Sequence, residues 1–242
     1  VSTLFLSGER CIAQYSNLPL CTASNEQLFP DLVSDGHRGA IIAWMDARNG
    51  NRDVFIQRID ASGKALWKED GIAICQLPGS QGWPILIPVL NNDGAIIVWR
   101  DSRNGNPDLY AQRIDVNGTE LWDKNGVPLC QNLASQDDPR AIADGEDGVI
   151  VVWEDWRNSR QDLFAQRING KGETIWRKDG VAIYDGKGDQ YDPSLTTDQT
   201  GGAIFAWWDI STPEWRVFSQ RISAEGRKLW PDCGITVCEA NG

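Results

Sequence analysis

Short apolar runs separated by turn-forming residues follow one another along the chain, and their spacing predicts β-strands throughout. In the first copy of the pattern, PDLVSD (30–35), AIIAW (40–44) and DVFIQRID (53–60) read as three strands, and KALWKEDGIAIC (64–75) reads as a broken fourth. Asp-Gly, Asn-Gly and Ser-Gly turns stand between them. No segment keeps apolar residues at the 3.6-residue period of a helix for three turns, so we expect an all-β fold.

The whole pattern recurs with a period of about 54 residues. Two tryptophan series keep the same register over four copies: Trp44, Trp99, Trp153 and Trp207, and Trp67, Trp122, Trp176 and Trp230. Four antiparallel strands in a unit of this length are typical of a β-propeller blade. A β-solenoid and a sandwich built from two repeat pairs are the alternatives.

We therefore expect one β-propeller domain over residues 1–242, with strands A to D in each blade. Its parts are a half repeat with strands C and D and a linker at 1–29, then full repeats at 30–83, 84–138, 139–192 and 193–242. Four full repeats and a half leave the blade number open. The ring has four blades with two extra strands, or five blades, or the chain is an arc of a larger propeller and a piece of a longer protein.

Charged residues recur around the turn between strands B and C. Asp46 and Arg48 precede the Asn-Gly turn and Asp53 closes it. The fourth repeat has Ser211 and Arg216 at the places of Arg48 and Asp53, so both change together. We predict that this arginine and this aspartate pair across the hairpin. A calcium loop is disfavoured, because the arginine opposes a cation and the terminal glutamate of an EF-hand is missing; no metal or cofactor is expected.

Four glutamines each stand three residues before a proline, ahead of strand A. They are Gln27, Gln81, Gln136 and Gln190. A glutamine side chain can both donate and accept hydrogen bonds, so we predict that these residues fix the linker backbone.

The amino-acid composition limits the classes of molecule that can be binding partners of this chain. The formal net charge is −11, with 34 acidic against 23 basic residues. Nucleic acid and anionic membrane surfaces would be repelled. No apolar run approaches the roughly 20 residues that span a bilayer. The lone histidine, His37, belongs to a turn at the far end of the blade, and no catalytic motif is present, so no catalytic residue is predicted.

The six cysteines do not form a disulfide framework in this scheme. Four of them occupy one repeat position and are expected to be buried thiols in separate blades: Cys21, Cys75, Cys130 and Cys238. Cys11 and Cys233 stand outside the pattern and are free to pair with another cysteine.

Function is expected where the copies differ. Trp83, Trp156 and Trp215 break the tryptophan pattern, and all three map to the blade end that carries the B–C turns and the D–A linkers. Asp138 and Asp192 lie at the same end. Exposed aromatic rings beside carboxylates are typical of a carbohydrate-binding surface, so these five residues are the candidate ligand site. Packing of the tryptophans beneath loops is the alternative.

The consensus AWxDxRNGNxDxYAQRIDxxGxxLWxxxGxxLC resembles repeats found in large secreted or cell-surface proteins of bacteria, and it covers the chain from about Asn17 to Cys238. The resemblance implies a β-propeller at an extracellular or cell-surface location. We expect a non-catalytic, lectin-like binding or interaction module whose partner is a glycan, another protein or other domains of a longer polypeptide. A glycoside hydrolase or lyase that uses loop acids, and a structural scaffold segment, are the alternative functions.

Overall fold

The computed structural model describes residues 19–89, 93–184, 186–210 and 215–237, and these residues form four antiparallel sheets of four strands each. Within every sheet the strands pair in chain order, as expected for propeller blades. Blade 1 holds β1 (Gln27–Ser34), β2 (Ala40–Asp46), β3 (Asp53–Ile59) and β4 (Ile72–Cys75). Blade 2 holds β5 (Gln81–Pro88), β6 (Ala95–Asp101), β7 (Asp108–Ile114) and β8 (Val127–Cys130). Blade 3 holds β9 (Gln136–Ala143), β10 (Val149–Asp155), β11 (Asp162–Ile168) and β12 (Val181–Tyr184). Blade 4 holds β13 (Gln190–Thr197), β14 (Ala203–Asp209), β15 (Arg216–Ile222) and β16 (Ile235–Thr236).

The predicted all-β repeat is confirmed, and two boundaries are refined. The first strand of each blade begins at the glutamine, three residues ahead of the proline that opened each predicted repeat. The fourth strand is broken as expected: Ala65 makes an isolated bridge with Ile59 before β4 begins. Most of the predicted N-terminal half repeat lies outside the described residues, as do Cys11 and Cys238.

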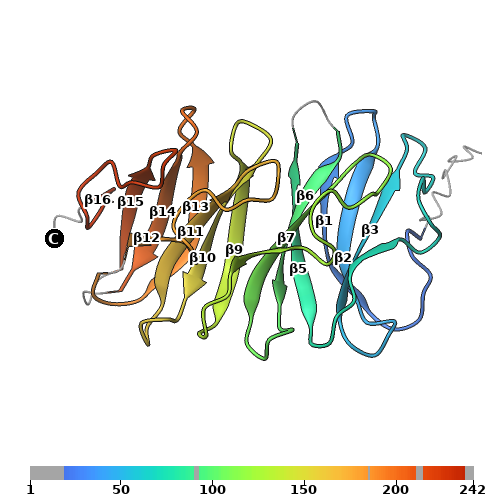
Figure 1. Cartoon of the computed structure of the whole chain (residues 1–242), viewed down its shortest axis with the longest axis horizontal. Helices are drawn as coiled ribbons and strands as arrows, with labels where there is room; N and C mark the ends of the chain where they lie inside the picture. The colour runs from blue at the N-terminus through green and yellow to red at the C-terminus, as the bar shows by residue number, and fades with distance from the viewer. Residues whose placement is uncertain (1–18, 90–92, 185, 211–214, 238–242) are drawn as a thin grey trace, which may run out of the picture.

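The four blades stand in a row. Figure 1 shows blade 1, in blue, and blade 4, in orange and red, at opposite ends of the longest axis of the molecule. The first strands contact one another in sequence, β1 with β5, β5 with β9 and β9 with β13, and so form the inner strands of the propeller. The described residues therefore form an open series of four blades, and blades 1 and 4 are not neighbours.

Each junction between blades holds an apolar core. Strand B of the two interior blades, β6 and β10, is a continuous buried run because both of its faces are covered, one by each neighbouring blade, whereas burial alternates along β14 of blade 4. In β6, for example, Ile96 and Val98 belong to the cluster shared with blade 3, while Ile97 and Trp99 belong to the cluster shared with blade 1. A third cluster joins blades 3 and 4. The described residues contain no helix that is long and apolar enough to cross a bilayer.

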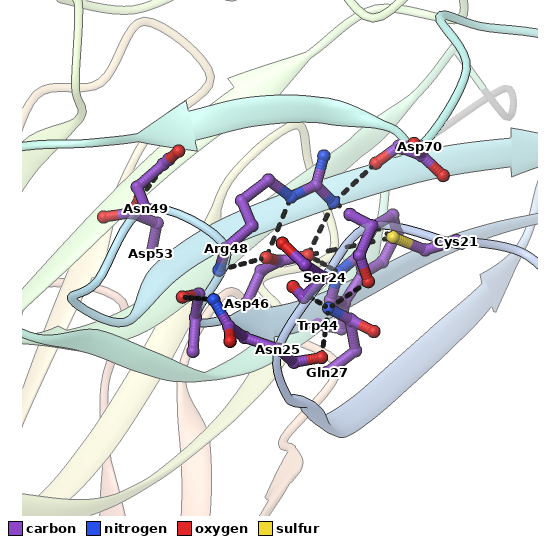
Figure 2. A network of polar contacts seen from close by, with 12 residues as sticks. Cys21, Ser24, Asn25, Gln27, Trp44, Asp46, Arg48, Asn49, Asp53 and Asp70 are labelled. Atoms are coloured by element: carbon purple, nitrogen blue, oxygen red, sulfur yellow. Dashed lines mark hydrogen bonds and ion pairs between the residues drawn. The ribbon is translucent and has the colours of Figure 1, made fainter.

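The charged turn is a structural brace, but its partners differ from the prediction. Figure 2 shows Arg48 folding back onto Asp46, with 2.5 Å between Nη2 and Oδ2, while Trp44 donates its indole N–H to the same carboxylate at 2.8 Å. Arg48 also donates to the carbonyl of Asp70. The predicted pair between Arg48 and Asp53 is wrong, because Asp53 accepts instead from the amides of Asn49 and Asn51.

The brace recurs in blades 2 and 3 and changes in blade 4. Arg103 pairs with Asp101 and Arg157 with Asp155 in the same way. In blade 4 the side chain of Gln190 donates to Asp209 at 2.8 Å, and the indole N–H of Trp207 has no partner among the described residues. In blades 1 to 3 the arginine also donates to a cysteine thiol and stands over an aromatic ring of strand C. Blade 4, which has Ser211 at this place, still forms its four strands.

The glutamines ahead of strand A fix linker backbone as predicted. Gln27 donates to the carbonyls of Ser24 and Asn25, and Gln190 donates to that of Gly188. Two of the repeated cysteines follow the prediction, since Cys75 and Cys130 are buried free thiols, whereas Cys21 is a free thiol that is only half-buried. Burial raises the pKa of Cys75 to about 11 and that of Cys130 to about 12. Cys233 is an exposed free thiol.

Candidate functional site

Every inner strand carries a bulge at the same place, opposite the buried tryptophan of strand B. In β1 the two residues Phe29 and Pro30 stand opposite the single Trp44. The register shifts at the equivalent place in β5, β9 and β13. Proline has no amide hydrogen to donate to the neighbouring strand. It is tolerated in a bulge, where the extra residue is not paired with that strand. The bulge therefore repeats because the proline repeats.

The residue before each of these prolines is held in the left-handed region of backbone space. The φ angles are 52° at Phe29, 50° at Trp83, 47° at Asp138 and 48° at Asp192. None of the four is glycine, so each conformation costs of order 1 kcal/mol and persists because the surrounding sheet fixes it. Strain of this kind concentrates at binding and catalytic sites. The four bulge residues are thus a set of equivalent positions, one in each blade, at which the side chain differs.

A cavity of about 740 Å³ lies along the inner strands, with walls from all four blades. We call it the inner-strand cavity. Its aromatic wall consists of the bulge residues Phe29 and Trp83, whose ring centroids are 5.4 Å apart. The two side chains remain 50% and 37% exposed. Half-exposed rings in a concave site offer a ligand a flat apolar surface.

Charged groups that also line the cavity are paired. Arg100 lies 2.9 Å from the carboxylate of Asp137, and Arg140 lies 2.5 Å from that of Asp138. The guanidinium of Arg100 also stands over the Trp83 ring, 5.1 Å from its centroid. Burial raises the pKa of Asp137, although the charge of Arg100 opposes that rise. The cavity thus combines aromatic faces with paired charges.

Glu154, in β10, lies near Asp138 and Asp192 but is not one of the residues that line the cavity. It is 9% exposed, and one of its oxygens accepts the backbone N–H of Asp192 at 3.0 Å. Burial raises the pKa of Glu154 to about 7; the charges of Asp138 and Asp192 add to the rise, and the hydrogen bond from Asp192 opposes it. A carboxyl group that titrates near neutral pH can donate or accept a proton in a reaction.

An aromatic stack leads from the bulge of blade 4 towards solvent. Trp208 lies between Tyr191 and Trp215, at centroid distances of 4.4 Å and 4.7 Å. Its indole N–H donates to the carboxylate of Asp192 at 2.9 Å. Trp215 is 71% exposed, so its outer face is a flat apolar surface open to solvent.

The structure unites only some of the five predicted site residues. Trp83 and Asp138 line the inner-strand cavity, and Asp192 occupies the equivalent bulge in blade 4. Trp215 is connected to Asp192 through the aromatic stack. Trp156 is 42% exposed in the turn between β10 and β11 and is not one of the residues that line the cavity.

Sequence reasoning missed Phe29, Arg100 and Glu154. Phe29 is not a tryptophan, so it breaks no tryptophan series, yet it shares its place before a proline with the three other bulge residues. Arg100 and Glu154 share the place directly after the strand-B tryptophan, where the other repeats have Met45 and Trp208. Side chains that vary within an otherwise fixed repeat were the available signal.

Comparisons with known proteins extend only to the fold. The chain matches no known protein family and no curated protein by sequence. It is similar to solved structures that include an endo-arabinase from Bacteroides thetaiotaomicron VPI-5482, with 12% identity, a TM-score of 0.45 and coverage of 83% of this chain and 76% of that chain. An α-L-arabinofuranosidase from Lactobacillus brevis has 11% identity, a TM-score of 0.49 and coverage of 87% and 72%. A glycosyl hydrolase from Bacteroides ovatus has 11% identity, a TM-score of 0.48 and coverage of 88% and 70%. Likeness at this level carries no argument about function.

Proposed function

We propose that this chain is a binding module that holds a neutral carbohydrate in the inner-strand cavity. The observation that carries the proposal is the pair of half-exposed rings, Phe29 and Trp83, set beside carboxylates in a concave site. The C–H faces of a sugar ring pack on aromatic rings, and sugar hydroxyl groups donate hydrogen bonds to carboxylates. The volume of about 740 Å³ falls within the range of roughly 300–1,000 Å³ usual for small-molecule sites.

The charge around the cavity favours a neutral ligand. Three aspartates and two arginines line the cavity, and both arginines are paired with an aspartate. Glu154 adds a further acid beside Asp138. An anionic sugar would meet more negative than positive charge and would be disfavoured. Repulsion by the acidic chain as a whole acts in the same direction.

We also propose an extracellular or cell-surface location, with a glycan as the partner. The resemblance of the repeat to those of secreted bacterial proteins supports this location. Another protein, or another domain of a longer polypeptide, is the partner to test if no glycan binds.

Calorimetric titration with a panel of neutral oligosaccharides tests the binding proposal. Trp83→Ala removes the burial of an aromatic face, worth about 1.5–3 kcal/mol, and should weaken binding by about tenfold or more. Trp156→Ala is the matched control, because it removes an exposed tryptophan outside the cavity and should leave affinity unchanged. Trp156→Ala should keep the melting temperature of the wild type, and a thermal melt should show that Trp83→Ala is still folded at the temperature of the titration. Binding that depends on Trp156 and not on Trp83 would place the ligand elsewhere.

A second function, hydrolysis of the bound glycoside, is favoured by one observation. Glu154 is a buried acid close to Asp138 and Asp192, burial raises its pKa to about 7, and glycosidases use a pair of carboxyl groups of which one has a raised pKa. Release of reducing ends from a bound glycan, lost in Glu154→Gln, would establish the enzyme. A glycan that binds and stays intact would leave the chain a binding module.

A further inference from the structure

The same set of hydrogen bonds connects neighbouring blades at all three junctions. After strand C, each of blades 1 to 3 presents a tryptophan whose indole N–H donates to a carbonyl in the C–D turn of the next blade, at 3.1, 3.0 and 2.9 Å. The three bonds are Trp67 to Val116, Trp122 to Gly170 and Trp176 to Ala224. An arginine at the end of each strand C donates to the same carbonyl: Arg58, Arg113 and Arg167 in turn. We call the tryptophan and arginine together the clasp, and the turn that accepts them the seat.

The seat requires a glycine two residues after the accepting carbonyl. Gly118, Gly172 and Gly226 have φ angles of 80°, 83° and 80°. A Cβ at these places would lie 3.2, 2.9 and 2.8 Å from the incoming indole ring. The tryptophan therefore packs directly on the bare backbone of the glycine, and the same contact occurs three times.

Blade 4 carries a complete clasp without a seat. Trp230 and Arg221 occupy the clasp positions. Arg221 donates within its own blade to Asp198 and Thr200, and no carbonyl of a further blade accepts from either clasp residue within the described part of the chain.

Among the described residues, the face around this clasp is apolar and partly exposed. Val217 is 42% exposed, whereas its equivalent in blade 2, Leu109, is fully buried. Val237 is 59% exposed, whereas its equivalent Leu129 is 2% exposed. These positions are the ones that the following blade covers at the interior junctions.

Blade 1 carries the complementary seat, and no described residue supplies a clasp for it. Its C–D turn, Ala61–Gly63, aligns with the seat of blade 2 and has the glycine in place, with a φ of 83°. The residues of this turn are exposed, whereas Val116 and Gly118 are half-buried. On the same face, Leu32 is 63% exposed and its equivalent Leu86 is 6% exposed. The sequence one repeat earlier offers no clasp, since Leu4 and Ala13 stand at the places of Arg58 and Trp67.

We propose that two copies of this chain associate head to tail, with the clasp of blade 4 of one copy bound to the seat of blade 1 of the other. The contact continues an interface that the chain already forms three times, and it would bury the exposed apolar residues at both ends. Because the two surfaces differ, the association is heterologous, so it closes into a ring or extends as a chain of copies. Every such assembly contains the same junction between Trp230 and Gly63.

Analytical ultracentrifugation of the whole chain over a dilution series tests the proposal. The wild type should show species larger than one 26.9 kDa chain, and these species should dissociate on dilution. Trp230→Ala removes the clasp, and Gly63→Asn places a side chain in the seat while tolerating a positive φ. Each variant alone should sediment as a single chain. A mixture of the two variants retains one intact clasp and one intact seat, so it should form two-chain species and nothing larger.

Two controls separate this junction from general loss of stability. Gly50→Asn makes the same change at another turn glycine with a positive φ, where a Cβ meets nothing within 4 Å, and should assemble like the wild type. Trp156→Ala should also assemble like the wild type. A wild type that remains a single chain at every concentration, or assemblies that survive Trp230→Ala, would overturn the proposal.

Discussion

Replacing Glu154 with glutamine should make the stability of the protein depend less on pH. Burial raises the pKa of this carboxyl from 4.5 to about 7, so the folded state holds the proton more tightly than the unfolded chain does. The wild type consequently loses stability as the pH rises from about 4.5 to about 7, because folding then requires a buried charge. Glutamine is neutral at every pH and keeps an oxygen that can accept the N–H of Asp192.

The size of the effect follows from the shift in pKa. A rise from 4.5 to about 7 corresponds to at most about 3 kcal/mol between the two protonation states. For a chain of this size, 1 kcal/mol shifts the melting temperature by about 2–4 °C. Glu154→Gln should therefore melt above the wild type at pH 8, by up to about 6–12 °C, and close to it at pH 4.

Thermal unfolding followed by circular dichroism at pH 4 and pH 8 measures this difference. Glu69→Gln, which removes the same charge from an exposed side chain, is the control and should show nearly equal differences from the wild type at the two pH values. Equal differences for Glu154→Gln at pH 4 and pH 8 would refute the reasoning, because the buried charge would then cost nothing.

Three further predictions concern the framework of the blades. Arg103→Ala leaves a buried aspartate unpaired and should cost about 3 kcal/mol in urea unfolding, whereas Arg140→Ala, at a half-exposed pair, should cost less than about 1 kcal/mol. Gly126→Ala places a Cβ within 3 Å of the buried Trp99 ring and should destabilise the fold by several kcal/mol, against about 1 kcal/mol for Gly105→Ala, where nothing lies within 4 Å. Cys75, whose pKa burial raises to about 11, should resist maleimide at pH 7.5 in the native protein and react after denaturation, as mass spectrometry of labelled peptides would show; rapid native labelling would contradict its burial.

The repeat made most of the fold predictable. Two tryptophan series in constant register define the blade length, and the Asn-Gly and Ser-Gly turns locate the hairpins. The fourth repeat lacks the equivalents of both Arg48 and Asp53, but this joint loss did not reveal the partner of Arg48. That partner, Asp46, is two residues away in the sequence, so the arginine reaches it without crossing the hairpin. Asp53 is instead satisfied by the two asparagines of the turn.

The candidate site was predictable only in part. Trp83, Asp138 and Asp192 could be singled out as aromatic or acidic residues at one end of the blades, and each directly precedes a repeated proline, but the sequence did not show that this place is a bulge. In the bulge, two residues of strand A stand opposite one residue of strand B. This register is set by the pairing of the two strands and cannot be read from either strand alone. Glu154 could not be recognised as a buried acid because its burial comes from the inner strands of neighbouring blades.

The clasp and seat also determine how the protein can form on the ribosome. Trp67 finds its acceptor 49 residues later in the chain, and Trp122 finds its own 48 residues later. The indole of a newly made blade therefore has no acceptor until most of the next blade has emerged from the exit tunnel. It gains that acceptor before the blade after the next is made. Assembly can proceed in the order of synthesis, with one unsealed indole at the growing end at any moment. An interrupted translation product would display that indole, which is the kind of exposed apolar surface that chaperones and proteases recognise.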